Sequence, residues 1–336
     1  MTFIERAWRK QSWWLYLLAP LSCLFWGLSA LRRRAFATGI QRVTRLSVPV
    51  IVVGNISVGG NGKTPVVLAL VKHLIDQGYR PGILSRGYGA QCQDFPYLVN
   101  LDDTATWAGD EPLLMAQQSH VPVVIDPVRV RGGQLLATQC DVIICDDGLQ
   151  HYALHRDLEI VVMDGRRNGN GWVLPVGHLR ELPSRLKSVD YIIVNSANTV
   201  SPSEISMTLQ AQPIQPVNAN EQHGHDSLPV PHRFDWLVTG IGNPHRFMDT
   251  CATEKIEYTN TRIFPDHHPF NLSDMPQGSI IMTQKDAVKC ADFVIAGATV
   301  TPNWFYVPIQ AQFSDDFLLR LTQQLATITT RSEYGI

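Results

Sequence analysis

The feature of this sequence that most constrains its fold is a glycine-rich segment between an apolar run and an amphipathic segment. Residues 48–53 read VPVIVV, a β-branched run typical of a parallel strand that is buried on both faces. Residues 57–64 follow with the sequence SVGGNGKT, and residues 64–77 then show apolar side chains at helical spacing, ended by Gly78. Strand, glycine loop and helix in this order predict a phosphate-binding loop (P-loop).

The segment 57–64 offers several kinds of phosphate ligand. Its glycines let backbone N–H groups turn toward phosphate oxygens, and the start of the following helix adds partial positive charge. We expect Lys63 to reach the β- and γ-phosphates of a nucleotide, and Thr64 to place its hydroxyl on Mg²⁺. The expected nucleotide-binding residues are Ser57, Val58, Gly59, Gly60, Asn61, Gly62, Lys63 and Thr64. Ser57 departs from the general pattern G-x-x-x-x-G-K-[ST], which begins with glycine.

Further apolar runs indicate that the P-loop belongs to a doubly wound, mostly parallel α/β sheet. Short strand-like runs alternate with helical segments, at residues 81–84, 121–125, 142–145, 158–163 and 191–194. After a stretch rich in Ser, Pro, Gln, Asn and His, a strand-then-glycine pattern restarts at 236–240, and further strands are expected at 280–283 and 304–307. The sequence therefore predicts a P-loop NTPase-like fold with a second, smaller α/β domain.

We expect this chain to be divided into four parts. A chain of 336 residues exceeds what one core usually holds, since single cores rarely grow beyond about 250–300 residues. The expected parts are an N-terminal membrane-anchoring helix at 1–35, a P-loop nucleotide-binding domain at 36–215, a linker at 216–233 and a smaller C-terminal α/β domain at 234–330.

Residues 13–31 form an uncharged apolar segment between basic flanks. Residues 1–45 hold eight basic side chains and one acidic one, although the whole chain has a formal charge of −2. A cleaved signal peptide is disfavoured, because an arginine triplet follows the run instead of a small-residue cleavage site. The length is borderline for a spanning helix. Pro20 and the two basic flanks favour a helix that lies in or dips into the cytoplasmic leaflet, and a helix buried against the body is the alternative.

Composition excludes several other classes of protein. Only 17% of the residues are charged and 45% are hydrophobic, which argues against a disordered or nucleic-acid-coating chain. Six cysteines occur without a Cys-x-x-Cys pair, so neither a zinc site nor a disulfide framework is expected. A reduced, cytoplasmic-facing body follows, and we expect no nucleic-acid partner and no obligate protein partner.

The apolar run at 142–145 ends in two carboxylates, Asp146 and Asp147. Alone, such an ending is more often a turn than a metal site. Beside a P-loop it predicts Mg²⁺ coordination, because ligands in doubly wound folds bind at the carboxyl ends of the strands.

A P-loop indicates nucleotide use but leaves the reaction open. Switch GTPases are disfavoured, because Asp146-Asp147-Gly148 has the wrong spacing and the motif at 283–286 (TQKD) places Lys and Asp next to each other. Phosphoryl transfer to a hydroxyl needs a base, which Asp110 or His267 could supply. The alternative interpretation of Asp110 is a helix cap. Arginines that face the phosphates would also be needed, and the candidates are Arg86, Arg129, Arg131 and Arg180, each otherwise a surface charge.

Taken in order along the chain, these motifs resemble the tetraacyldisaccharide 4′-kinase family. The matching segments are Gly54-Asn55, SVGGNGKTP at 57–65, SRGYG at 85–89, GDEP at 109–112, DDGLQH at 146–151, Leu174-Pro175, LRE at 179–181 and Asp266-His267. The resemblance covers nearly the whole chain. It implies transfer of the ATP γ-phosphate to the 4′-hydroxyl of a tetraacylated glucosamine disaccharide 1-phosphate in lipid A biosynthesis. It also implies a peripheral or monotopic enzyme on the cytoplasmic face of the inner membrane.

The same resemblance suggests roles for individual residues. It implies that Asp110 is the catalytic base, that His267 is paired with it, and that Lys63 acts on the phosphates. It implies ATP and Mg²⁺ as cofactors, with Thr64, Asp146 and Asp147 near the metal. The expected substrate-binding residues are Arg129, Arg180 and Glu181. Two other functions stay open: a membrane-bound P-loop ATPase or switch protein without a phosphorylated acceptor, and a kinase for a soluble sugar.

Overall fold

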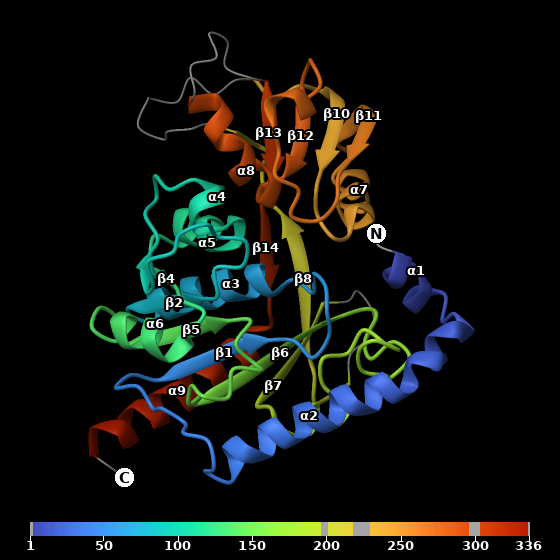
Figure 1. The fold of residues 1–336 in the computed structure, drawn as a ribbon. Helices are drawn as coiled ribbons and strands as arrows, with labels where there is room; N and C mark the ends of the chain where they lie inside the picture. The colour runs from blue at the N-terminus through green and yellow to red at the C-terminus, as the bar shows by residue number, and fades with distance from the viewer. Residues whose placement is uncertain (1–2, 196–200, 218–228, 296–302, 335–336) are drawn as a thin grey trace.

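The structure, a computed structural model, describes residues 3–195, 201–217, 229–295 and 303–334 (Figure 1). Within these residues nine strands form a sheet in the order β14-β8-β7-β6-β1-β5-β2-β4-β3. Their bounds are β1 Val50–Gly54, β2 Pro81–Ser85, β3 Tyr97–Leu98, β4 Val123–Ile125, β5 Val142–Asp146, β6 Leu158–Asp164, β7 Tyr191–Asn195, β8 Ile205–Ala211 and β14 Ile309–Gln312. All neighbours pair in parallel except β3 with β4 and β14 with β8. The predicted mostly parallel sheet is confirmed.

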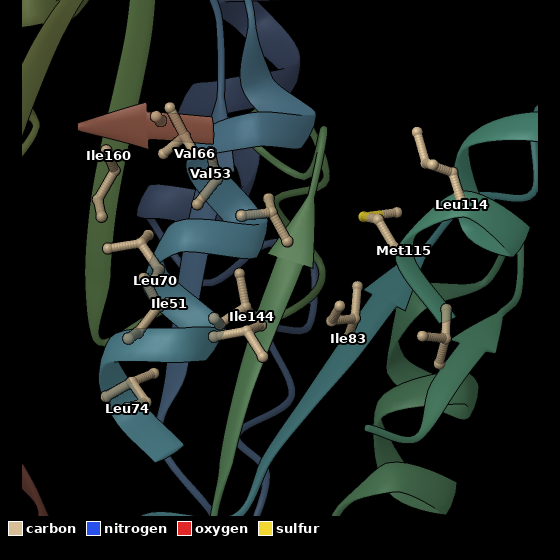
Figure 2. Close-up of a cluster of buried hydrophobic side chains, with 14 of the residues drawn as sticks. Ile51, Val53, Val66, Leu70, Leu74, Ile83, Leu114, Met115, Ile144 and Ile160 are labelled. Carbon is tan, nitrogen blue, oxygen red and sulfur yellow. The ribbon is translucent and has the colours of Figure 1, made fainter. Parts of the chain in front are cut away.

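Helices cover both faces of this larger sheet, as expected for a doubly wound fold. On one face lie α3 (Lys63–Asp76), α4 (Ala105–Ala108), α5 (Asp110–Ser119) and α9 (Asp315–Tyr334). On the other face lies α6 (Arg129–Leu136) together with the segment 149–179. In β1, Ile51 and Val53 point to the first face and Val50 and Val52 to the second, so the whole strand is buried. Figure 2 shows the packing of β1 against α3.

The order of the strands places the predicted sites at one edge of the sheet. From β1 the chain moves through β2 to β4 on one side, and from β5 through β6 and β7 to β8 on the other. The winding direction therefore reverses at β1 and β5, which are neighbours. The crevice outside the carboxyl ends of strands at such a switch point is where doubly wound folds bind ligands.

A second sheet forms the smaller α/β unit (Figure 1). Its order is β11-β10-β12-β13-β9, with bounds β9 Gln215–Pro216, β10 Arg233–Thr239, β11 Glu257–Ile263, β12 Ile280–Thr283 and β13 Trp304–Val307. Helix α7 (Pro244–Thr253) packs on one face and α8 (Gln284–Ile295) on the other. A short 3-10 turn, η3 (Leu272–Asp274), lies between β11 and β12.

The end of the chain corrects one expected range. The smaller domain was expected at 234–330, but β14 pairs antiparallel with β8 of the larger sheet. Helix α9 then buries Phe317, Leu321 and Leu325 in the core of the larger sheet. Residues 309–334 therefore belong structurally with the larger sheet, because that is where their apolar side chains are buried. Most of the expected linker at 216–233 lies outside the described residues.

The N-terminal segment forms α1 (Phe3–Arg9), η1 (Trp13–Leu18) and α2 (Ala19–Ala37) along the side of the larger unit (Figure 1). Its inner face is docked: the Ser22 hydroxyl donates to the carbonyl of Val173 at 3.0 Å and accepts from the N–H of Val176 at 3.1 Å. The Trp8 indole donates to the carbonyl of Pro175 at 2.9 Å. Within the described part of the chain, Trp13–Ala37 is the one stretch of helix that is long and apolar enough to cross a membrane.

The outer face of α2 and η1 carries an exposed leucine stripe. The stripe consists of Leu17, Leu21, Leu24, Leu28 and Leu31, each more than half exposed. Their spacing of three and four residues places them on one side of the helix. The segment is therefore neither a fully buried helix nor a helix that stands free of the body.

Candidate functional site

The P-loop connects β1 to α3, as predicted, and its serine has a structural role. Asn61 donates from Nδ2 to the Ser57 hydroxyl at 2.9 Å. Ser57, which replaces the usual first glycine, thus forms a hydrogen bond across the loop. Gly59 and Gly62 have φ values of +102° and +88°, in the left-handed region that glycine adopts without strain. The N–H of Val58 donates to the carbonyl of His178 at 2.9 Å, which ties the loop to the segment 172–181.

Lys63 and the two carboxylates at the end of β5, Asp146 and Asp147, lie at the carboxyl edge of the sheet. The Lys63 Nζ lies 3.5 Å from Asp147 Oδ1, and the Arg180 Nη1 lies 3.1 Å from Asp147 Oδ2. Burial opposes ionisation of Asp147, but the charges of Lys63 and Arg180 outweigh it and lower the pKa of this carboxyl. Asp147 is thus a carboxylate already engaged by two cations.

Asp146 differs sharply from its neighbour. Its side chain is 3% exposed, and its Oδ1 is a buried oxygen without a hydrogen-bond partner. Burial, together with the negative charge of Glu111, raises the pKa of Asp146 to about 7. A buried carboxylate oxygen with no partner costs free energy unless a cation or a donor satisfies it. Asp146 Oδ1 is therefore an oxygen that a hard cation could satisfy.

A metal at this position would depend on ligands beyond the protein. Among the residues that the structure describes, no group of three or more His, Cys, Asp or Glu side chains is arranged to hold a metal ion. Mg²⁺ is commonly held by one or two carboxylates with waters and substrate phosphates completing its octahedron. Asp146 beside the P-loop fits that kind of site, and it does not fit an all-protein metal cage.

Asp110 and His267 are brought together from the two sheets. Asp110 begins α5 and His267 lies in the loop after β11, and His267 Nδ1 is 3.0 Å from Asp110 Oδ2. The other carboxylate oxygen, Oδ1, accepts from the N–H of Glu111 at 2.9 Å, and the N-cap of the helix is Gly109. Burial would raise the pKa of Asp110, but the hydrogen bond from His267 and the charge of Lys285 lower it to about 2. Asp110 is a carboxylate at physiological pH.

The three residues expected to bind substrate occupy different environments. Arg129 is buried and donates to the carbonyls of Asp126 at 2.9 Å and Asp146 at 3.4 Å, so it braces the ends of β4 and β5. Arg180 pairs with Asp147, as described above. Glu181 is buried and accepts from Gln150 Nε2 at 2.9 Å and from the Tyr152 hydroxyl at 2.7 Å. Their substrate-binding roles stay predictions.

Two further residues at this edge were not singled out by the sequence patterns as site residues. Arg166 follows β6 and donates to Asn61 Oδ1 at 2.7 Å, and its guanidinium fills the space where a side chain at position 59 would stand. Lys285 stands in the first turn of α8 and its Nζ lies 2.9 Å from Glu111 Oε1. Only their positions in the sequence could have pointed to them. Arg166 directly follows a strand that lies next to β1, and Lys285 belongs to the TQKD motif, which by itself argues only against a GTPase.

The fold and the site together define a P-loop phosphotransferase in which an Asp–His pair joins the larger and the smaller α/β units. The family model of tetraacyldisaccharide-1-P 4′-kinase (LpxK) matches residues 14–326. The chain belongs to this family.

Curated relatives and a solved structure agree with this assignment. The chain is 46% identical over 329 residues to the tetraacyldisaccharide 4′-kinase of Tolumonas auensis, covering 96% of this chain and 97% of that protein. It is 46% identical over 312 residues to the enzyme of the same name from Pseudoalteromonas atlantica, covering 92% and 99%. The crystal structure of the "apo" form of LpxK from Aquifex aeolicus in complex with ATP aligns with a TM-score of 0.79 at 28% identity, covering 94% of this chain and 99% of that chain.

Proposed function

We propose that this protein transfers the γ-phosphate of ATP to the 4′-hydroxyl of a tetraacylated glucosamine disaccharide 1-phosphate, a step of lipid A biosynthesis. The observation that carries this proposal is the Asp110–His267 pair at 3.0 Å, which joins the two α/β units. The pair lies next to Glu111, whose charge acts on Asp146 at the end of β5. The family assignment and the names of the relatives supply the acceptor.

Each residue of the site has a task in this reaction. The P-loop N–H groups and Lys63 hold the triphosphate and neutralise charge on the transferring group. Asp110 accepts the proton of the attacking 4′-hydroxyl, and His267 orients this carboxylate through its hydrogen bond to Oδ2. Asp146 and Thr64 would hold Mg²⁺, which when bound neutralises negative charge on the phosphate oxygens. Between the two neighbouring carboxylates, Asp146 is the better candidate for direct metal contact, because Asp147 already pairs with Lys63 and Arg180.

A prediction follows for Asp146. In Asp146→Asn we expect kcat/KM for ATP to fall by about 100-fold or more, because the charged ligand of the cation is lost. The concentration of Mg²⁺ needed for half-maximal activity should rise at the same time. Asp141→Asn is the matched control, since Asp141 precedes the opposite end of the same strand and pairs with Arg80. A folded Asp146→Asn enzyme with the parental Mg²⁺ requirement would remove Asp146 from the metal site.

The alternative of an ATPase or switch protein without a phosphorylated acceptor is less well supported, because such a protein has no need of an acceptor base. Incubation of the full chain with γ-labelled ATP and a membrane lipid extract separates the alternatives. We expect label in a lipid product whose mass increases by one phosphate. Label that reaches only free phosphate would contradict a lipid kinase.

We further propose that α2 lies in the cytoplasmic leaflet of the inner membrane, with its leucine stripe facing the acyl chains. Ser22 and Trp8 fix the inner face of the N-terminal segment to the body, which leaves the stripe free on the outside. Arg33 of α2 lies 3.9 Å from Glu181. The helix therefore passes close to residues 179–181, which directly follow His178, the residue that contacts the P-loop. A lipid acceptor that stays in the bilayer can then present its sugar to the site.

Membrane binding gives a second prediction. Leu24 and Leu28 are 59% and 60% exposed, and we expect Leu24→Gln/Leu28→Gln to weaken binding to anionic liposomes by about tenfold or more. Liposome flotation measures this directly. The matched control is Leu272→Gln/Leu319→Gln, which changes two leucines of the same exposure, 60% and 59%, elsewhere on the surface. Equal binding by both double variants would argue against the stripe as the membrane contact.

A further inference from the structure

Lys285 occupies the centre of a charged cluster around the Asp110–His267 pair. Its Nζ lies 2.9 Å from Glu111 Oε1, 3.3 Å from His267 Nε2 and 3.6 Å from Asp110 Oδ2. Asp266 Oδ1 is also within 3.9 Å. The side chains of Lys285 and Asp110 are only 18% and 8% exposed, so their contact is shielded from water, whereas Glu111 and Asp266 are 36% and 42% exposed. The Lys285 ammonium therefore contacts both Asp110 and His267. It also contacts Glu111, which follows Asp110 in the sequence, and lies near Asp266, which precedes His267.

The cluster joins parts of the chain that belong to different sheets. Asp110 and Glu111 begin α5, which packs on the core of the larger sheet. Asp266 and His267 follow β11, and Lys285 stands in the first turn of α8, which packs on the smaller sheet. Helices α5 and α8 are in contact with each other. Lys285 is thus a cation of the smaller unit that reaches two carboxylates of the larger one.

The contacts of Lys285 determine which nitrogen of His267 carries the proton. An ammonium can only donate hydrogen bonds, so the Nε2 that faces it must accept. The proton of neutral His267 then resides on Nδ1, from which it donates to Asp110 Oδ2. Protonation of Nε2 would direct an N–H toward the ammonium. Lys285 therefore opposes the uptake of a proton from solvent by the Asp110–His267 pair. This keeps Asp110 unprotonated, as it must be before it can accept the proton of the acceptor hydroxyl.

We propose that Lys285 is a positioning residue of phosphoryl transfer, which fixes the tautomer of His267 and, through Glu111, holds the Asp110–His267 pair between the two sheets. This inference rests on the proposed function, since the pair has a catalytic task only if a hydroxyl is phosphorylated. Lys285 acts through Asp110, Glu111 and His267, and no contact of its own with a substrate is required.

The charges that face this cluster define the expected pH dependence. They are Asp110 and Glu111 from α5, Asp266 and His267 from the loop after β11, and Lys285 from α8, with a smaller effect from Lys289 of the same helix. The hydrogen bond that His267 donates to Asp110 raises the pKa of His267, as do the negative charges of Asp110 and Asp266, whereas burial and the charge of Lys285 lower it. Without Lys285 the pair takes up its first proton more readily. The acid limb of kcat/KM for the lipid acceptor must then move to higher pH.

The test compares three variants of the full-length enzyme. In Lys285→Met we expect the acid limb to shift upward by about one pH unit or more, because an opposite charge within this distance alters a carboxyl pKa by about one to three units. The value of kcat at neutral pH should fall by roughly tenfold or more, a part of what a positioned base contributes. Lys285→Arg, which keeps the charge and the donors, should return the acid limb toward its parental position.

Lys289→Met is the matched control on the same helix. Lys289 Nζ pairs with Asp286 Oδ1 at 2.9 Å and lies over the Phe270 ring, so this variant disturbs α8 without removing a contact to the Asp110–His267 pair. We expect it to lower thermal stability and to shift the acid limb by much less than Lys285→Met, because the charge of Lys289 lowers the pKa of Asp110 less than the charge of Lys285 does. An unmoved acid limb in Lys285→Met, or an equal shift in Lys289→Met, would overturn the positioning role.

The failure of the proposed function would be recognised separately. If the parental enzyme transfers no label from ATP to lipid, the proposed function is wrong and the inference is overturned with it. If the parental enzyme makes the phosphorylated lipid but Lys285→Met keeps its rate and its pH profile, only the role of Lys285 is wrong.

Discussion

The Asp110→Asn variant is expected to bind ATP like the parental enzyme and to phosphorylate the lipid acceptor about 100- to 10,000-fold more slowly. Asparagine keeps the shape of the side chain, but its amide cannot accept the proton of the attacking hydroxyl. Asp110 contacts His267, Lys285 and the N–H of Glu111, so its replacement leaves the loop 57–64 undisturbed. Steady-state turnover with the lipid acceptor and calorimetric titration with ATP measure the two quantities independently.

Asp266→Asn is the matched control for this prediction. Asp266 also borders Lys285, at 3.9 Å, but its side chain is 42% exposed and it is not the partner of His267 Nδ1. The loss of a partly exposed charge contact should alter turnover by no more than about fivefold. Parental turnover in Asp110→Asn would assign the base elsewhere, and an equal loss in both variants would point to the net charge of the cluster instead of to a base.

The buried strands were predictable because burial on both faces of a sheet requires a continuous run of apolar residues. Strands β1, β5 and β6 lie inside the larger sheet and have both faces covered, so nearly every residue in them is apolar. The site at their carboxyl ends followed from the same logic. Asp146 stands at the last position of β5, beside the P-loop that follows β1, and parallel pairing of the two strands brings them together.

The return of the chain to the larger sheet could not be predicted in the same way. Strand β14 reads IQAQ, which lacks an apolar run and becomes a strand only through its pairing with β8. Helix α9 has an apolar face, but its spacing does not say which core will bury Phe317 and Leu321. Contacts between distant parts of the chain decide both the pairing of β14 and the burial of α9, and no short stretch of sequence reveals those contacts.

The charged cluster around Asp110 and His267 shows the same limit. Lys285 and Glu111 are separated by 174 positions in the sequence, so no spacing rule connects them. The TQKD motif at 283–286 resembles a guanine-binding motif only superficially, and its lysine meets Asp110 and Glu111 through the contact between α8 and α5. Single polar residues whose partners come from another sheet are what sequence patterns identify least well, and here they surround the expected base.

Lys63→Ala is the second variant for which a large effect is expected. Turnover should fall by about 100- to 1,000-fold, and the KM for ATP should rise together with it. Lys63 opens α3 at the end of the P-loop, where its ammonium can reach the phosphates. Since the charge acts on the phosphates both before and during transfer, its loss weakens the ground state and the transition state, and the two kinetic constants should change together.

The contacts of Lys63 in the described structure explain why this variant should stay folded. Its present partner, Asp147, keeps the ion pair with Arg180 at 3.1 Å when Lys63 is removed, so no buried carboxylate is left without a cation. Arg180 also lets Lys63 exchange Asp147 for a phosphate when nucleotide binds. Lys72→Ala on the exposed side of the same helix is the matched control and should keep parental constants. If Lys63→Ala matched this control in turnover and in KM, the loop 57–64 could not be the site that holds the transferred phosphate.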